Sequence, residues 1–349
     1  MKRSKQLFFL LLSLALTLTW AFHGFAAEKP FYEGKTIRLI IGTSAGGTYD
    51  LWARVVAPYL TKHIPGNPHI ISQNMPGAGS LVAANYVYGL AKPDGLTLGS
   101  VNPALYFEQL IGRTEVQFGW AQFTWIGSPE QNESLFVIRT DTPYRTVNDL
   151  RTAKEPPKCG ASGTTSSDWY ISRLLEETLG VKIKIVTGYP GSAEVGLAIL
   201  RGEVICRITQ VGSWFSHELF RTWRKEGFVR ALLQTGRKRD PRLPEVPTIY
   251  ELMEQYKTPE SGRRLAHVLV TPPLLGRPIM GPPGLAAERV KILREAYTKA
   301  MNDPELLAEA KKRDWEVKHL TGEELESLAK EVIEQPPDVV ERMKRVLGN

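Results

Sequence analysis

Small and hydroxyl-bearing residues gather in a glycine-rich turn near the start of the chain. The segment from Lys35 to Asp50 is typical of a strand, a turn of Gly, Ser and Thr, and a helix that begins near Asp50. Gly46 and Gly47 leave the main chain uncovered where that helix starts. Free N–H groups and the positive end of a helix dipole attract anions. The turn therefore predicts a site for a negatively charged ligand.

Turns of the same composition follow three later strands. They occupy residues 75–80, 161–168 and 187–194, and the strand over residues 203–209 ends in Gln210. In open α/β sheets, ligands bind at the edge where parallel strands end. We therefore expect these hydroxyl-rich turns to lie at the carboxyl ends of parallel strands and to face one ligand.

Short apolar strands alternate with amphipathic helices, which predicts an α/β fold with parallel sheets covered on both faces. This pattern restarts after Gly127. We expect a first lobe made of residues 27–129 plus 236–349 and a second lobe over 130–235. The chain must cross between them two or three times, and such crossings act as a hinge.

The last third of the chain is mostly helical in pattern. Two apolar stretches interrupt it, and they predict strands over Arg263–Thr271 and Trp315–Val317. The expected helices are Glu288–Met301, Pro304–Arg313, Gly322–Glu334 and Pro337–Val346.

Residues 1–26 have the pattern of a signal peptide. A basic start at Lys2, Arg3 and Lys5 precedes the apolar run from Leu7 to Trp20, and small residues end at Ala26. We expect cleavage after Ala26 and a periplasmic protein. An uncleaved anchor is the alternative, although the apolar run is shorter than the roughly 20 residues that span a bilayer.

Composition argues against several other classes of protein. The formal net charge of +7 comes without a dense basic cluster, so we expect no nucleic-acid partner. Cys159 and Cys206 are the two cysteines, and a disulfide or two buried thiols are both compatible with their positions. Neither they nor the scattered histidines have the spacing of a metal site, so we expect no metal and no cofactor.

Several short motifs occur in order along the chain. They are Gly34–Ile40, Ala45–Thr48 with Asp50, Leu51–Arg54, Asn74–Ser80, Pro93–Gly95, Leu243–Thr248 and Pro282–Gly284. In this ordered set, from about Lys29 onward, the chain resembles the substrate-binding proteins of the tripartite tricarboxylate transporter system, the Bug family of periplasmic receptors. The resemblance implies a periplasmic-binding-protein fold of the type II-like class, with two Rossmann-like lobes joined by a hinge of crossing strands. It also implies a monomer that closes on a small carboxylate and delivers it to integral membrane permease subunits.

The same resemblance implies which residues bind the ligand, through main-chain N–H groups and small side chains. The residues are Ser44, Ala45, Gly46, Gly47, Thr48, Tyr49, Gly77, Ala78, Gly79, Ser162, Gly163, Thr164, Thr165, Ser166, Tyr189, Gly191, Ser192 and Gln210. Neutral donors of this kind hold a carboxylate without the desolvation cost of a buried ion pair. Arg207 and Arg277 are candidates for direct pairing with the ligand, with surface or structural roles as the alternative.

Two features of the sequence bear on which kind of carboxylic acid is the ligand. The strand tip from Arg207 to Gln210 lacks the acidic residue that many family members carry, which favours a simple or aromatic carboxylate over an amino acid. Tyr49, Trp52, Trp169 and Trp214 could line an apolar pocket, although helix-core positions are expected for Trp52 and Trp169. We interpret Asp50 as the N-cap of the first helix.

Two other functions are compatible with parts of the sequence. Gly42 to Gly46 matches the G-x-S-x-G pattern of hydrolases, with Ser44 as nucleophile, but it comes too early in the chain for that fold. A receptor that presents its ligand to a membrane sensor kinase would have the same pocket. We expect a non-catalytic transport receptor.

Overall fold

The strand that precedes the first glycine-rich turn lies inside a six-stranded sheet. A computed structural model describes residues 29–164 and 166–347 and places this strand between two parallel neighbours. In order across the sheet, the strands are β11 (Leu320–Thr321), β4 (Thr124–Ser128), β10 (Ile279–Gly281), β3 (Thr97–Ser100), β1 (Thr36–Ile41) and β2 (His69–Asn74). Ile41 is in register with both Asn74 and Ser100, so β1, β2 and β3 end at one edge.

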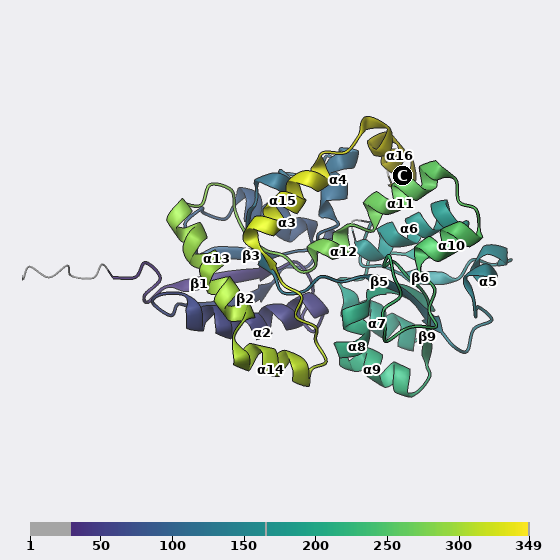
Figure 1. The fold of residues 1–349 in the computed structure, drawn as a ribbon, viewed down its shortest axis with the longest axis horizontal. Helices are drawn as coiled ribbons and strands as arrows, with labels where there is room; N and C mark the ends of the chain where they lie inside the picture. Colours follow the sequence, from purple (N-terminus) through teal and green to yellow (C-terminus); the bar gives the residue numbers. More distant parts are fainter. Residues whose placement is uncertain (1–28, 165, 348–349) are drawn as a thin grey trace, which may run out of the picture.

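Helices cover both faces of this sheet, which forms the left-hand lobe in Figure 1. They are α2 (Thr48–His63), α3 (Leu81–Gly89), α4 (Leu105–Ile111), α13 (Ala287–Met301), α14 (Pro304–Lys312) and α15 (Gly322–Ile333). Ile37, Leu39 and Ile41 of β1 share a buried cluster with residues of α2, α13 and α14. Ile40 belongs to a different cluster, with residues of α3, α4 and α15. A strand buried on both sides is typical of parallel sheets.

A five-stranded sheet forms the second lobe. Its order is β7 (Lys184–Val186), β6 (Lys158–Gly160), β8 (Cys206–Gln210), β5 (Ser134–Arg139) and β9 (Val229–Gln234). The helices that follow these strands include α5 (Val147–Thr152), α6 (Ser167–Leu179), α7 (Ser192–Leu200), α8 (Val211–Ser216) and α9 (Glu218–Lys225). The α/β class and the two-lobed architecture expected from the sequence are confirmed.

Two details of the predicted sheets are wrong. Strands β6, β7 and β8 are parallel, but β5 runs antiparallel to β8 and β9. Ser134 is in register with Gln210, so β5 starts at the edge where β8 ends. In the first sheet, the pairs that include β10 or β11 are also antiparallel. Strands β5, β10 and β11 therefore start at the ligand edge, and the segments that follow them lie at the opposite edge.

The two strands predicted in the last third are also wrong. The stretch Arg263–Thr271 lies mostly in α11 (Glu260–Leu269), and Trp315–Val317 forms no strand. Leu265, Ala266 and Leu269 are the buried residues that place α11 against α6. Their helical spacing outweighs the strand preference of the nearby apolar residues.

The chain crosses between the sheets in two segments that lie side by side. One joins β4 to β5, and the other runs from α12 (Pro272–Leu275) to β10. The Asn132 N–H donates to the Pro273 carbonyl at 2.9 Å, and the Arg277 N–H donates to Ser128 Oγ at 2.8 Å. Gly276 has a φ of +64°, and a Cβ there would lie 1.6 Å from the Glu130 carbonyl oxygen. Only glycine allows this contact between the two crossings.

Helices from the end of the chain also join the lobes. Helix α16 (Pro337–Leu347) contacts α4 of the first lobe and α6 of the second, and it lies near α11 in Figure 1. Helices α10 (Ile249–Gln255) and α11 contact α6 as well. The lobe limits at 129/130 and 235/236 stay a prediction.

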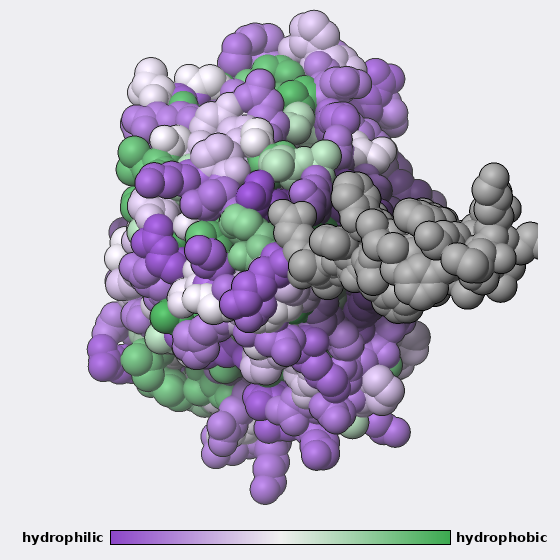
Figure 2. Space-filling view, turned by 90° about the vertical axis from the view of Figure 1, so that its left-hand side faces the viewer, coloured by the Kyte–Doolittle hydropathy of each residue, from purple (hydrophilic) through white to green (hydrophobic). Residues whose placement is uncertain are grey.

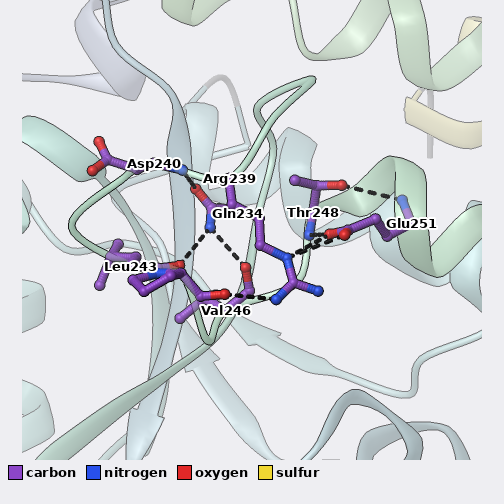
Figure 3. A network of polar contacts seen from close by, with 8 residues as sticks. Gln234, Arg239, Asp240, Leu243, Val246, Thr248 and Glu251 are labelled. Carbon is purple, nitrogen blue, oxygen red and sulfur yellow. Dashed lines mark hydrogen bonds and ion pairs between the residues drawn. The ribbon is translucent and has the colours of Figure 1, made fainter.

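A buried glutamine organises the loop that carries the Leu243–Thr248 motif (Figure 3). Gln234 Nε2 donates to the carbonyls of Leu243 and Val246, at 3.2 and 2.7 Å, and its Oε1 accepts the Asp240 N–H at 2.8 Å. Thr248 then forms a capping box at the start of α10. The motif therefore holds a loop against the end of β9 in the second sheet.

The outer surface is mixed in polarity. Figure 2 shows a face on which hydrophobic residues occur in groups separated by hydrophilic ones. The large apolar side chains that are most exposed are Ile71, Val82, Leu90, Leu197, Leu200, Leu274 and Leu307. No helix in the described part of the chain combines the length and apolar character that a bilayer crossing requires. The expected signal peptide over 1–26 lies outside the described residues.

Cys159 and Cys206 form a disulfide, which the sequence left open. They are direct partners on the neighbouring parallel strands β6 and β8, and both are buried. The bond closes a loop across 47 residues of sequence. It thereby ties the two strands whose carboxyl ends carry Ser162 and Gln210.

Replacing both cysteines by serine should lower the free energy of unfolding by about 2–4 kcal/mol, because the unfolded chain regains the freedom of the long loop. Urea unfolding of oxidised protein, reduced protein and the double variant measures this. We expect the variant and the reduced protein to unfold at the same, lower urea concentration. Equal midpoints for all three would contradict the stabilising role.

Candidate ligand-binding cleft

Three helices begin at one cavity between the lobes. Thr48 and Tyr49 start α2 of the first lobe, whereas Ser167 and Asp168 start α6 and Ser192 starts α7 of the second. The N–H groups of a first helical turn have no partner within the helix, and the helix dipole is positive there. The cavity is therefore surrounded by main-chain donors and by positive potential.

The cavity measures about 50 Å³. Half of the residues expected to bind the ligand line it: Gly47, Thr48, Tyr49, Gly79, Ser162, Ser166, Gly191, Ser192 and Gln210. The other described candidates do not line it, namely Ser44, Ala45, Gly46, Gly77, Ala78, Gly163, Thr164 and Tyr189. Thr165 lies outside the described residues. A binding role for each of these residues stays a prediction.

Arg207 and Arg277, the two candidates for direct pairing with the ligand, also line the cavity, together with residues that were not among the candidates: Gly42, Thr43, Ser80, Asn102, Ser167, Asp168 and Pro190. Most of them adjoin predicted residues in the same turns, and Asn102 follows β3, so the rule that ligands bind where parallel strands end could have found them. Arg277 lies in the second crossing segment. The sequence indicated Arg277 as a candidate for direct pairing with the ligand, and that role stays a prediction.

A polar network holds the first turn in place. Asp50 accepts hydrogen bonds from the Gly46 N–H, from Arg54 Nε and from Asn74 Nδ2, at 2.9–3.0 Å. Asn74 Nδ2 also donates to the Thr43 carbonyl at 2.9 Å. Burial would raise the pKa of Asp50, but these hydrogen bonds outweigh it and lower the pKa. Helix α2 begins at Thr48, so the interpretation of Asp50 as its N-cap is wrong, although its carboxylate does bind the turn.

The turn after β2 has an unusual backbone. Gly77, Ala78, Gly79 and Ser80 all have positive φ, at 144°, 44°, 62° and 85°. This conformation is costly for Ala and Ser, and strained backbone of this kind occurs at functional sites. Ser80 Oγ donates to the Gly42 carbonyl at 3.0 Å, which joins this turn to the end of β1. This hydrogen bond helps to hold the strained backbone of residues 77–80 at the edge of the cavity.

A buried ion pair links the hinge to the cavity. Arg277 of the second crossing pairs through Nε with Glu130 of the first, and both side chains are at most 4% exposed. Arg277 Nη2 donates to Ser213 Oγ of the second lobe at 3.1 Å, and its guanidinium lies 4.9 Å from the ring centre of Tyr49 in the first. Burial raises the pKa of Glu130, and Arg277 opposes this shift. Arg277 therefore contacts both lobes and both crossings.

A second ion pair lies on the other side of the cavity. Arg207 Nη2 donates to Asp168 Oδ2 at 3.3 Å, and Arg207 is 3% exposed. The two pairs place charged side chains beside the neutral donors that the resemblance implies. The β8 tip does lack an acid, but Asp168 of α6 supplies one. The sequence argument against an amino-acid ligand therefore loses its basis.

Hydrogen bonds between the lobes surround the cavity. Ser44 Oγ donates to Glu194 Oε2 at 2.9 Å, and His217 Nε2 lies 3.1 Å from the Gly46 carbonyl oxygen. Closer to the cavity, Ser213 Oγ donates to Thr48 Oγ1 at 3.0 Å. In addition, Ser167 Oγ donates to Asn102 Oδ1 at 2.9 Å. The lobes are therefore in a closed arrangement.

The tryptophans do not form an apolar pocket for the ligand. Trp52, Trp169 and Trp214 are 2%, 6% and 4% exposed, and all three belong to hydrophobic clusters outside the cavity. Tyr49 is the aromatic residue among those that line the described cavity. This favours the core interpretation of Trp52 and Trp169, and it gives no support to an aromatic ligand.

A larger crevice of about 720 Å³ lies elsewhere between the lobes. It lies between Phe215 of α8 and Trp315 near the end of α14. Its charged groups pair with one another, since Arg242 contacts both Asp240 and Glu316. The crevice lacks the converging helix starts of the smaller cavity, so we do not assign the ligand to it.

Comparisons with known proteins identify the family. Residues 52–344 match the family described as tripartite tricarboxylate transporter family receptor. The chain belongs to this family. The expected resemblance is thereby confirmed, and so is the expectation that this is a substrate-binding receptor and not an enzyme.

Individual relatives are distant. A protein of Cupriavidus necator described as the UPF0065 protein in the gbd 5' region is 27% identical over 322 residues, which cover 91% of this chain and 90% of the relative. The periplasmic binding protein BugD has a similar structure, with a TM-score of 0.72 at 20% identity over 90% of this chain and 98% of BugD. MatC from Rhodopseudomonas palustris, solved with bound malate, has a TM-score of 0.69 at 20% identity, covering 90% and 99% of the two chains.

The site geometry agrees with a receptor of this family. Ser44, the residue of the G-x-S-x-G pattern, donates to Glu194, while the nearby His217 contacts the Gly46 carbonyl. In the described part of the chain, Ser44 therefore has no histidine base within hydrogen-bonding distance. A nucleophilic serine needs such a base, so the hydrolase alternative has no structural support.

Closure of the lobes can be tested at Gly191. Its backbone is extended, so any residue can adopt it, but a Cβ would lie 2.3 Å from Ser44 Oγ of the opposite lobe. Gly191→Ala should therefore weaken ligand binding at least tenfold and leave the thermal stability of the unliganded protein within a few degrees. Gly89→Ala is the matched control, because a Cβ there meets nothing within 4 Å. Unchanged affinity in Gly191→Ala would contradict the closed arrangement as the ligand-bound one.

His217 should make stability depend on pH. Burial lowers its pKa, and its Nδ1 accepts the Leu219 N–H while Nε2 donates to Gly46. The folded protein thus favours neutral His217. Its contribution is fully present above the unfolded pKa of about 6.5 and falls by at most about 1.4 kcal/mol per pH unit as pH drops below that value.

His217→Asn keeps a capping side chain for α9 and removes the titration. Chemical unfolding at pH 7.5, 6.5 and 5.5 measures the difference between the variant and the natural protein. We expect the natural protein to lose more stability than the variant below pH 6.5. If the free energy of unfolding changes equally with pH in both proteins, His217 is not the group responsible for the pH dependence.

Proposed function

We propose that this protein is a periplasmic solute receptor that captures a small carboxylate between its lobes and delivers it to a tripartite tricarboxylate-type membrane permease. The observation that carries the proposal is the convergence of α2, α6 and α7 on one enclosed cavity. Helix N-termini bind anions through free N–H groups and through the helix dipole. Since the helices come from both lobes, an anion bound between them would favour the closed state.

Two side chains add donors to this site. Thr43 Oγ1 is buried and has no hydrogen-bond partner within the described residues. Arg277 uses Nε and Nη2 for Glu130 and Ser213, and among the described residues its Nη1 has no acceptor. A ligand carboxylate would satisfy both groups. An unpaired buried donor such as Thr43 Oγ1 is costly, so a hydrogen bond from it to the ligand adds to affinity.

The size of the cavity favours a short ligand. About 50 Å³ corresponds to room for about four water molecules. MatC was solved with malate, and a further R. palustris relative with adipate, at a TM-score of 0.69 and 21% identity. We therefore expect short mono- or dicarboxylates to bind better than tricarboxylates or aromatic acids, which would keep the lobes further apart.

Thermal unfolding with a panel of acids tests this proposal. Mono-, di-, tri- and aromatic carboxylates are added to refolded mature protein, with the corresponding esters as controls. A ligand at a thousand times its dissociation constant stabilises by about 4 kcal/mol, so a shift of several degrees is expected for short acids. No shift with any acid would overturn the carboxylate assignment.

Gly47→Val tests where the ligand binds. Gly47 has an ordinary backbone conformation, and a Cβ there would lie 3.4 Å from the Ser44 carbonyl oxygen and 4.0 Å from Ser192 Cβ of the other lobe. The valine methyl groups should block the main chain of the turn and abolish the thermal shift without unfolding the protein. A shift that survives in this variant would exclude the cavity as the binding site.

Delivery to a permease is tested in cells. If the gene is deleted, uptake of the acid that gives the largest thermal shift should fall. Normal uptake combined with loss of a transcriptional response to the same acid would instead support the sensor-kinase alternative.

A further inference from the structure

We propose that the ligand carries a hydrogen-bond donor, a hydroxyl or ammonium group, beside its carboxylate, and that Asp168 is the specificity-determining residue that receives it. This inference rests on the proposed function and concerns the same cavity. The binding site would then have two chemically different sides, one that donates to a carboxylate and one that accepts from a substituent.

Asp168 is an acceptor with spare capacity. It lines the cavity, and its side chain is 13% exposed. Among residues 29–164 and 166–347, one other side chain donates to it, Arg207 Nη2 at the long distance of 3.3 Å. An ionised carboxylate has room for about four hydrogen bonds. Burial raises the pKa of Asp168, although Arg207 opposes this, so a further donor would stabilise the charged group.

Arg207 is not available to bind the ligand in place of Asp168. Its Nε donates to the Ile208 carbonyl at 3.0 Å, and Nη1 donates to the Ser192 carbonyl at 2.8 Å. Nη2 divides its hydrogens between Ser192 Oγ, at 3.1 Å, and Asp168. Arg207 therefore holds the start of α7 and balances the charge of Asp168. A ligand carboxylate placed beside Asp168 would meet a like charge without a free cation.

The hydroxyl groups of the two serines that precede Asp168 do not supply the missing donor. Ser166 Oγ donates to the Gly163 carbonyl at 2.8 Å, and Ser167 Oγ donates to Asn102 at 2.9 Å. Thr43 Oγ1 and Arg277 Nη1, for which no acceptor is found among the described residues, belong to β1's turn and to the hinge. A ligand that satisfies all of these groups needs both an anionic end and a donor.

Matched acids test this inference by calorimetric titration. The probes are succinate, malate and aspartate, together with the shorter series propionate, lactate and alanine. In the natural protein, the hydroxy or amino acid of at least one series should bind at least tenfold more tightly than the unsubstituted acid. Comparison of the hydroxy acid with the amino acid distinguishes the two kinds of donor.

Two variants assign the selectivity to Asp168. Asp168→Ala should reduce the ratio of the affinity for the substituted acid to that for the unsubstituted acid to about two or less. The main cause should be weaker binding of the substituted acid. Asp168→Asn keeps a neutral acceptor, so it should retain most of a preference for a hydroxyl group and lose a preference for an ammonium group. Glu177→Ala removes an acid of the same helix that accepts from Arg342 and does not line the cavity, so this matched control should keep the natural ratio.

The outcomes separate this inference from the proposed function. If none of the six acids binds the natural protein, small-carboxylate binding itself fails. If the acids bind with equal affinity within each series, or if Asp168→Ala keeps the natural ratio, the role of Asp168 is overturned while the receptor function stands. Circular dichroism verifies that each variant is folded, and the Asp168→Asn ratios decide the matter if Asp168→Ala does not fold.

Discussion

The ion pair between Arg277 and Glu130 is the constraint on which the cleft depends. It joins the two crossing segments in a buried position, beside the close contact of Gly276 with the Glu130 carbonyl. Removing one partner of such a pair is strongly destabilising, since a buried charge would be left alone. Arg277 also contacts Ser213 of the second lobe and the Tyr49 ring of the first. The hinge and the site are therefore one structure, and a ligand that touches Arg277 acts on both.

The site combines charge balance with a field from the backbone. The two arginines that line the cavity are matched by Glu130 and Asp168, so the side chains contribute little net charge. The preference for an anion then comes from the starts of three helices and from the strained turn over residues 77–80. These groups are fixed by the fold, and they are brought to one place only when the lobes close.

The fold and part of the site could be predicted from the sequence because both follow from local patterns. The alternation of apolar strands, small-residue turns and helices predicted two α/β lobes, and the rule that ligands bind where parallel strands end indicated the turns at Gly47, Gly79 and Gly191. Other features depend on contacts between distant parts of the chain. Arg277 was a candidate for ligand pairing with a surface or structural role as the alternative, and Asp168 ended a turn predicted to face the ligand. Their ion pairs with Glu130 and Arg207 follow only from the packing of the chain. The sequence predicted a strand where α11 lies, because the partner of its apolar residues, helix α6, is remote in sequence and could not be known from the local pattern.

Hydrogen exchange measured peptide by peptide, with and without malate, tests the central claim most directly. Binding in the closed cavity should slow exchange at the starts of α2, α6 and α7 together, since one ligand occupies donors from both lobes. Slower exchange only around the large crevice near Phe215 and Trp315, with malate bound, would contradict the proposed site.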